Sequence, residues 1–177
     1  MATHYEVLPI PARMAFTHLI AAGPIQIGVE YRLLNEEIIA EEYGEDSRAK
    51  FGNKAPPGLP TTIEEDGVSI HVFDASARRE YLRFDCFDDF PHYHYIDPDA
   101  ERQTVHDFDE VADGPMDEWV IRCLSGRLPE MLACAGAEAL ARDLDPKTLE
   151  PALENVAREI ERARRSGRPI PVESTTT

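Results

Sequence analysis

Two histidines and an aspartate near the middle of the chain have the residue types and spacing of a metal site. His92 and His94 are separated by a single residue. Residues two apart on a β-strand project to the same side, so both imidazoles would face one ligand. Asp85, on the preceding strand, could supply a third ligand or orient the ring of His94. The sequence therefore predicts a divalent-metal site formed by Asp85, His92 and His94.

The same stretch allows a second chemistry without a metal. Asp85 would orient His94 as a general base, and Arg83 would hold a carboxylate or phosphate group of a small anionic ligand. Asp85 should then raise the pKa of His94 if the two side chains meet on a covered face. The candidate catalytic residues are Asp85, His94 and Arg83, and the candidate ligand-binding residues are Ser69, His71, Tyr81 and Arg83.

An antiparallel meander of strands must position these side chains. Strict alternation of apolar and polar residues predicts strands over residues 68–73, 81–87 and 92–96. A fourth strand, residues 61–65, would precede them through a tight turn at Asp66-Gly67. The alternating segment 25–33 predicts a further strand at an edge of the sheet.

The register of this meander separates an apolar face from a polar face. We expect His71 to lie opposite Arg83, and Asp85 opposite His94. A slip by one residue would mix the two faces. Phenylalanines on the polar face favour a cover formed by a loop, a ligand or another subunit. The predicted polar face carries Thr62, Glu64, Ser69, His71, Phe73, Tyr81, Arg83, Asp85, Phe87, His92 and His94.

The C-terminal third has the pattern of helices that would cover the apolar face. Pro115 suits the first turn of a helix, and Pro129 opens another short segment. Gly167 favours a helix stop. The predicted fold is α+β, an antiparallel meander with C-terminal helices packed on one face. The predicted helices cover residues 15–22, 35–43, 115–126, 137–144 and 151–165.

Length and composition predict one globular domain. The chain has 177 residues, and 42% of them are hydrophobic. We expect a single domain over residues 1–167 and a flexible tail over residues 168–177. A Gly/Pro-rich loop is predicted at residues 44–60 and an acidic irregular segment at residues 97–114. No apolar run has the length of a membrane span and no signal peptide is evident, so no membrane association is expected.

Charge and cysteine usage narrow the classes of function. The formal net charge of −16 would repel phosphate backbones, which argues against nucleic-acid binding. It favours either plain solubility or a basic protein partner. The three cysteines form no CxxC pair, which is typical of a reducing cytoplasm. Nucleophile-elbow, P-loop and dinucleotide-binding motifs are absent, which disfavours serine hydrolases, NTPases and Rossmann oxidoreductases.

The motif Arg83-Phe84-Asp85-x-Phe87, followed by Pro91-His92-Tyr93-His94-Tyr95, resembles the core of a group of small uncharacterised bacterial proteins. This resemblance covers the meander and the helix after it, and it implies no established activity. Residues 83–94 have a fainter similarity to toxins of TumE-like toxin–antitoxin pairs. The strong acidity of this chain departs from what an RNA-targeting toxin should show.

Two classes of function remain open from the sequence. In the first, the His/Asp/Arg face binds a divalent metal or a small anion and could support catalysis. In the second, the protein has no catalytic activity. The same face, with Phe73 and Phe87, would then form the interface of a homodimer or of a complex with a protein partner.

Overall fold

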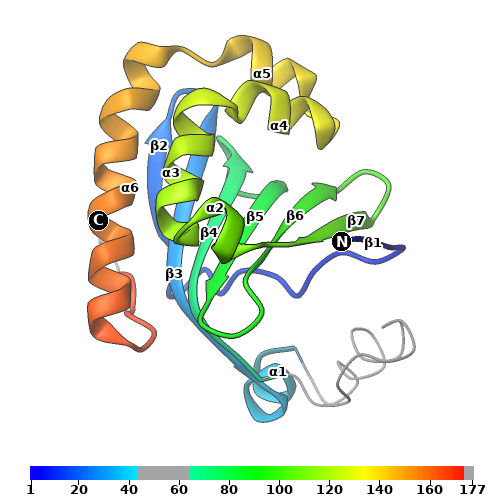
Figure 1. The fold of residues 1–177 in the computed structure, drawn as a ribbon, viewed down its shortest axis with the longest axis vertical. Helices are drawn as coiled ribbons and strands as arrows, with labels where there is room; N and C mark the ends of the chain where they lie inside the picture. Colours follow the sequence, from blue (N-terminus) through cyan, green and yellow to red (C-terminus); the bar gives the residue numbers. More distant parts are fainter. Residues whose placement is uncertain (44–63, 174–177) are drawn as a thin grey trace.

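Residues 1–43 and 64–173 are described by the computed structural model of the chain (Figure 1). Their strands form one seven-stranded sheet in the order β1-β7-β6-β5-β4-β3-β2. Every neighbouring pair is antiparallel. The strands are β1 (Ala2–Tyr5), β2 (His18–Ala22), β3 (Ile25–Asn35), β4 (Glu64–Asp74), β5 (Glu80–Phe87), β6 (His92–Asp97) and β7 (Arg102–Asp107).

One helix follows β3, and the other described helices follow β7. Asn35 caps the N-terminus of the first, because its Oδ1 accepts a hydrogen bond from Ile38 N at 2.9 Å. The helices are α1 (Glu36–Tyr43), α2 (Glu110–Asp113), α3 (Met116–Gly126), α4 (Leu128–Cys134), α5 (Glu138–Asp143) and α6 (Pro146–Ser166). Within residues 1–43 and 64–173, none of them combines the length and the apolar content needed to span a lipid bilayer.

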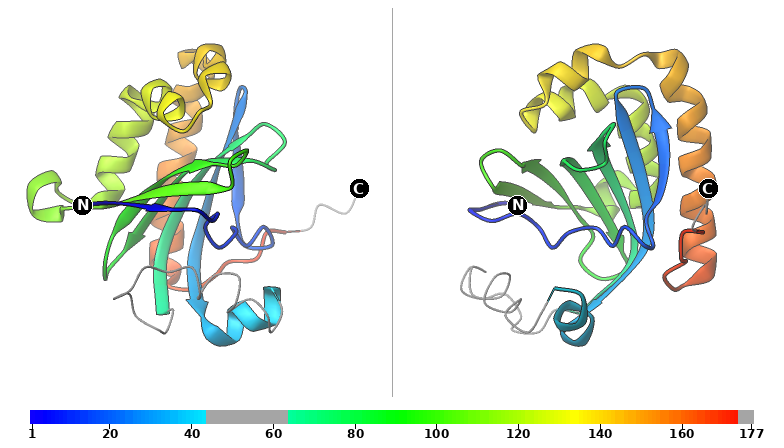
Figure 2. Two further views of the ribbon diagram at one scale, coloured as in Figure 1. Left: turned by 90° about the vertical axis from the view of Figure 1, so that its right-hand side faces the viewer. Right: turned by 180° about the vertical axis from the view of Figure 1, so that it is seen from behind.

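The apolar face of the sheet is covered by C-terminal helices, which confirms the predicted α+β fold. Helix α6 packs on β2, β3 and β4, while α3 and α4 pack on β5 (Figures 1 and 2). Leu153, Val156 and Ile160 of α6 are buried in the same core as Val72 and Phe84 of the sheet. Burial of such side chains is the main favourable contribution to folding.

Helix α6 begins five residues earlier than the predicted segment 151–165. Asp145 caps it, since its Oδ1 accepts a hydrogen bond from Lys147 N at 3.0 Å, and Pro146 occupies the first turn. Gly167 ends the helix in the left-handed conformation, as expected. Beyond it, Val172 N donates to Ala15 O at 2.8 Å, so the predicted tail is attached to the chain at this point.

The predicted register is confirmed between β4 and β5, where His71 pairs with Arg83. Between β5 and β6 the register differs by two residues. Asp85 pairs with His92, not with His94, and His94 pairs with Arg83. The connection is longer than predicted because the last two residues of β5 pair with β4 but not with β6. Because this shift is even, the side chains of β6 stay on their predicted faces.

Three predictions about strand boundaries and positions are wrong. The Asp66-Gly67 turn does not form, because β3 extends to Asn35 and pairs with β4 along its whole length. Strand β3 is an internal strand and not an edge, because β2 pairs with its other side. Residues 18–22 form strand β2 and not part of a helix, because they pair with β3. The predicted loop 44–60, and residues 61–63 of the predicted fourth strand, lie outside the described residues.

Two strands at one side of the sheet were not predicted. Strand β7 lies in the acidic segment 97–114, which was expected to be irregular, and it pairs with β6 and with β1. Strands β1 and β2 therefore occupy opposite edges of the sheet. Residues 6–17 connect these two edges and cross the polar face (Figure 2). We call residues 6–17 the strap.

Candidate metal site beside a buried ion network

The polar face of the sheet is buried, although its residues are charged. The strap covers it, and the carbonyl oxygen of Ile10 accepts hydrogen bonds from Arg32 Nη2 and Arg83 Nη1, each at 2.8 Å. Only 2% of Arg83 is exposed, and Phe73 and Phe87 are buried as well. The predicted cover is therefore supplied by the chain's own strap.

Asp85, His92 and His94 meet on this face, and we call them the Asp–His cluster. The Nε2 atom of His94 lies 2.9 Å from Asp85 Oδ2, and the Nε2 atom of His92 lies 3.4 Å from the same oxygen. One potential ligand atom from each of the three residues lies within 4.8 Å of the others. The three predicted metal ligands are thus brought together, with His92, whose side chain is 18% exposed, on the outer side.

The other polar atoms of the cluster are held by neighbouring oxygens. His92 Nδ1 lies 2.8 Å from the carbonyl oxygen of Phe90, which can only accept, so this nitrogen carries the proton. His94 Nδ1 lies 2.7 Å from Oε1 of Gln103 and donates to it. Ser69 Oγ donates to Asp85 Oδ1 at 2.5 Å. Both imidazoles are therefore fixed with Nε2 facing the carboxylate.

Burial and charge act in opposite directions on the pKa values of this cluster. Burial alone would raise the pKa of Asp85, but the hydrogen bond from His94 and the charges of His92, His94 and Arg83 hold it well below its ordinary value. Burial lowers the pKa of His94 and outweighs the raising effect of Asp85. The predicted increase of the His94 pKa is therefore wrong, because desolvation of the imidazolium is the larger effect.

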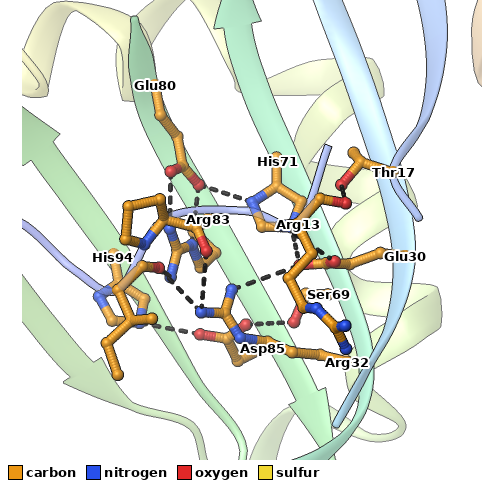
Figure 3. Close-up of polar contacts among 12 residues, drawn as sticks. Arg13, Thr17, Glu30, Arg32, Ser69, His71, Glu80, Arg83, Asp85 and His94 are labelled. Carbon is orange, nitrogen blue, oxygen red and sulfur yellow. Dashed lines mark hydrogen bonds and ion pairs between the residues drawn. The ribbon is translucent and has the colours of Figure 1, made fainter. Parts of the chain in front are cut away.

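A second group of charges lies beside the Asp–His cluster on the same face (Figure 3). Arg83 binds Glu80 with two nitrogens, Nε at 2.8 Å from Oε1 and Nη2 at 2.6 Å from Oε2. His71 lies between two carboxylates, with Nδ1 at 2.7 Å from Glu80 and Nε2 at 3.2 Å from Glu30. Arg32 Nη1 lies 3.4 Å from Glu30 Oε1. We call Glu30, Arg32, His71, Glu80 and Arg83 the ion network.

The charges of the ion network stabilise each other. Burial alone would lower the pKa of His71, but Glu80 and Glu30 raise it overall. Burial alone would raise the pKa of Glu80, yet Arg83 and His71 lower it far below its ordinary value. Each ring nitrogen of His71 faces a carboxylate oxygen, and the ring lies apart from the predicted ligands on β6.

The candidate ligand-binding residues do not form one group. Ser69 touches the Asp–His cluster, whereas His71 and Arg83 belong to the ion network. Tyr81 packs in the apolar core and not on the predicted polar face. A β-bulge opposite Val72 and Phe73 gives β5 one extra residue relative to β4. Glu80 therefore takes the position on the polar face that was predicted for Tyr81.

Sequence reasoning missed Glu30, Arg32, Glu80 and Gln103. Glu30 and Arg32 alternate with apolar residues in the predicted strand 25–33, so the sequence indicates that they share one face of that strand. It does not indicate which residues of other strands they contact. Gln103 lies on β7, which was not predicted. Glu80 reaches the face through the bulge.

Comparisons with known proteins give a family but no activity. A family model described as a domain of unknown function, DUF7700, matches residues 19–160, which include the Asp–His cluster and the ion network. No curated protein and no solved structure matches the chain. The similarity to TumE-like toxins finds no support in these comparisons. Because the model covers well over half of the chain, the protein belongs to the DUF7700 family of unknown function.

Proposed function

We propose that this protein binds a divalent transition-metal ion through Asp85, His92 and His94. One observation carries the proposal. Both histidines donate from Nδ1 to a neighbouring oxygen, while both Nε2 atoms converge on one carboxylate oxygen. Metal-binding histidines are commonly oriented in this way, because the outer hydrogen bond fixes the tautomer and directs the ring.

The separations of the two imidazole nitrogens from the Asp85 oxygen agree with a metal coordination shell. With metal–ligand bonds of about 2.1 Å, neighbouring ligand atoms are roughly 3.0 Å apart in octahedral and 3.4 Å apart in tetrahedral geometry. The two nitrogen–oxygen distances are 2.9 and 3.4 Å. The lowered pKa of His94 also favours the neutral ring that a metal requires.

The set of ligands indicates which ions would bind. Two imidazoles and one carboxylate suit Zn²⁺, Fe²⁺ and related ions, whereas Mg²⁺ and Ca²⁺ prefer oxygen ligands alone. Three protein ligands leave at least one coordination position for water or for a substrate atom, as in catalytic zinc sites. The proposal therefore includes a route to catalysis but names no substrate.

The alternatives have less support from the same geometry. A base oriented by Asp85 was expected to show a raised pKa at His94, whereas burial lowers the pKa of His94 overall. Arg83 is occupied by Glu80 and by the strap, which disfavours a free anion site. An interface through Phe73 and Phe87 stays a prediction, but both rings are buried within one chain.

Metal loading of purified protein tests the proposal. The protein is stripped with a chelator, dialysed against zinc, and analysed for its metal content, and the zinc affinity is then measured by competition with a chromophoric chelator. We expect one equivalent of zinc in the wild type and none in the double variant His92→Ala, His94→Ala.

A matched control removes two histidines elsewhere. His4 and His106 lie on the neighbouring strands β1 and β7, away from Asp85. The variant His4→Ala, His106→Ala should keep one equivalent. Equal loss of zinc in both double variants, or no zinc in the folded wild type, would contradict the proposal.

A further inference from the structure

The geometry points to the backbone of Phe90 as the element that positions His92 for metal binding. This inference rests on the proposed function and adds a positioning residue to it. The carbonyl oxygen of Phe90 accepts the hydrogen bond from His92 Nδ1 at 2.8 Å. The direction of that carbonyl depends on the backbone conformation of Phe90, which is unusual.

Phe90 has a φ of 55°, in the left-handed region. Bulky residues rarely adopt this region, because the side chain approaches the backbone. Pro91 follows directly, and a residue before proline normally prefers extended backbone. Two independent steric effects thus oppose the conformation observed at Phe90.

The side chain of Phe90 does not compensate for this strain. It is 87% exposed, so its own burial contributes little. Contacts of the backbone are what hold the turn. Besides the bond from His92, the carbonyl oxygen of Pro91 accepts a hydrogen bond from Phe108 N at 3.0 Å. Strained residues persist where surrounding contacts determine them, and they are concentrated at functional sites.

The consequence for His92 is a fixed tautomer. A proton held on Nδ1 by the Phe90 carbonyl places the lone pair on Nε2, which is the atom that faces Asp85. If Phe90 relaxed to an extended conformation, its carbonyl would turn and His92 would lose this anchor. Phe90 therefore acts through His92 and not by touching a metal or a substrate.

A substitution series at Phe90 separates backbone conformation from side-chain size. Phe90→Gly and Phe90→Asn permit the left-handed region, whereas Phe90→Val strongly disfavours it. The nitrogen chemical shifts of His92 are measured by NMR in the metal-free protein, and zinc affinity is measured separately. We expect the Gly and Asn variants to keep the Nδ1-protonated ring and near wild-type affinity. The Val variant should mix tautomers and lose about 10- to 100-fold in affinity.

Glu101 provides the matched control, since it has a φ of 51° in the turn between β6 and β7. The same substitutions there should leave the His92 tautomer and zinc affinity unchanged. An unaltered tautomer in Phe90→Val, or an altered one in Phe90→Gly, would overturn the inference, as would equal effects at Glu101. Because the tautomer is read without metal, a wild type that binds no zinc would refute the proposed function while the NMR series still decides the role of Phe90.

Discussion

The ion network and the Asp–His cluster lie side by side on one buried sheet face, yet they satisfy their charges differently. In the ion network, carboxylates and cations alternate, and His71 and Arg83 share Glu80. In the Asp–His cluster, two imidazole nitrogens converge on one oxygen of Asp85. In the ion network every charged group already has an oppositely charged partner, so no bound ion is needed to balance it. The Asp–His cluster brings together three atoms that can all donate electron pairs to a cation.

Burial of charge alone therefore does not identify a functional site on this face. Each member of the ion network stabilises an oppositely charged neighbour, and Arg32 and Arg83 also hold the strap through Ile10. Its physical role is to allow a charged face to be covered. The Asp–His cluster is less important for covering this face. His92 is partly exposed, and its ring is held by a strained turn.

Breaking the ion network should give the largest change. Arg83→Met leaves Glu80 buried without its guanidinium partner, and removal of one partner of a buried ion pair costs about 3–5 kcal/mol. We expect this loss in the free energy of unfolding, measured in urea. Arg102→Met is the control, because its ion pair with Asp97 is exposed and worth about 1 kcal/mol or less. Similar losses in the two variants would show that the ion network is not what holds this face.

Metal should stabilise the protein through the Asp–His cluster alone. A ligand present at 100 times its dissociation constant raises the free energy of unfolding by about 2.7 kcal/mol. We expect this gain on adding zinc to the wild type, measured by urea unfolding. His92→Ala, His94→Ala should show none of it, and His4→Ala, His106→Ala should show all of it. A gain that survives loss of both cluster histidines would place the metal elsewhere.

Much of the fold could be predicted because the apolar pattern is local. The alternation of apolar and polar residues along β4, β5 and β6 indicates which face of the sheet each side chain occupies. The face of His71, Arg83, Asp85 and His94 was therefore predicted correctly. The register of β6 was wrong by two residues, but the diagonal approach of His94 to Asp85 still joined them.

The rest depended on contacts between distant segments. Strand β7 has no apolar alternation of its own, and its conformation comes from pairing with β6 and β1. The strap has no regular structure, so its path across the face follows from the positions of β1 and β2 at opposite edges. Glu80 is on the polar face because of one bulge, which no sequence pattern marked. The ion network could therefore not be assembled from the sequence, whereas the Asp–His cluster could.

The two buried histidines should respond to pH in opposite directions. The pKa of His71 is raised in the folded state, so its stabilising effect is present below about pH 6.5 and is lost as the pH rises through the folded pKa. The pKa of His94 is lowered, so its effect is present above about pH 6.5 and is lost as the pH falls toward the folded pKa.

Urea unfolding of metal-free protein between about pH 5 and pH 8 measures this contrast. The stability difference between wild type and His71→Gln should grow toward low pH, and that for His94→Gln should shrink, each by at most about 1.4 kcal/mol per pH unit. If the two stability differences changed with pH in the same direction, folding would shift the pKa values of His71 and His94 in the same direction, which would contradict this prediction.

The smallest expected effect concerns the serine that joins the Asp–His cluster to β4. Ser69 Oγ donates to Asp85 Oδ1 at 2.5 Å inside the protein, whereas Ser76 Oγ donates to Asp74 Oδ1 at 2.7 Å in an exposed turn. Ser69→Ala should cost about 1 kcal/mol in the free energy of unfolding, because Asp85 keeps its contact with His94 but loses one donor. Ser76→Ala should cost less, since water can replace the hydroxyl.

If Asp85 is a metal ligand, loss of the Ser69 hydroxyl also frees the Asp85 carboxylate to rotate. Zinc affinity should then fall in Ser69→Ala but not in Ser76→Ala. Loss of stability with unchanged zinc affinity would assign Ser69 to packing of the buried face and separate it from the metal site.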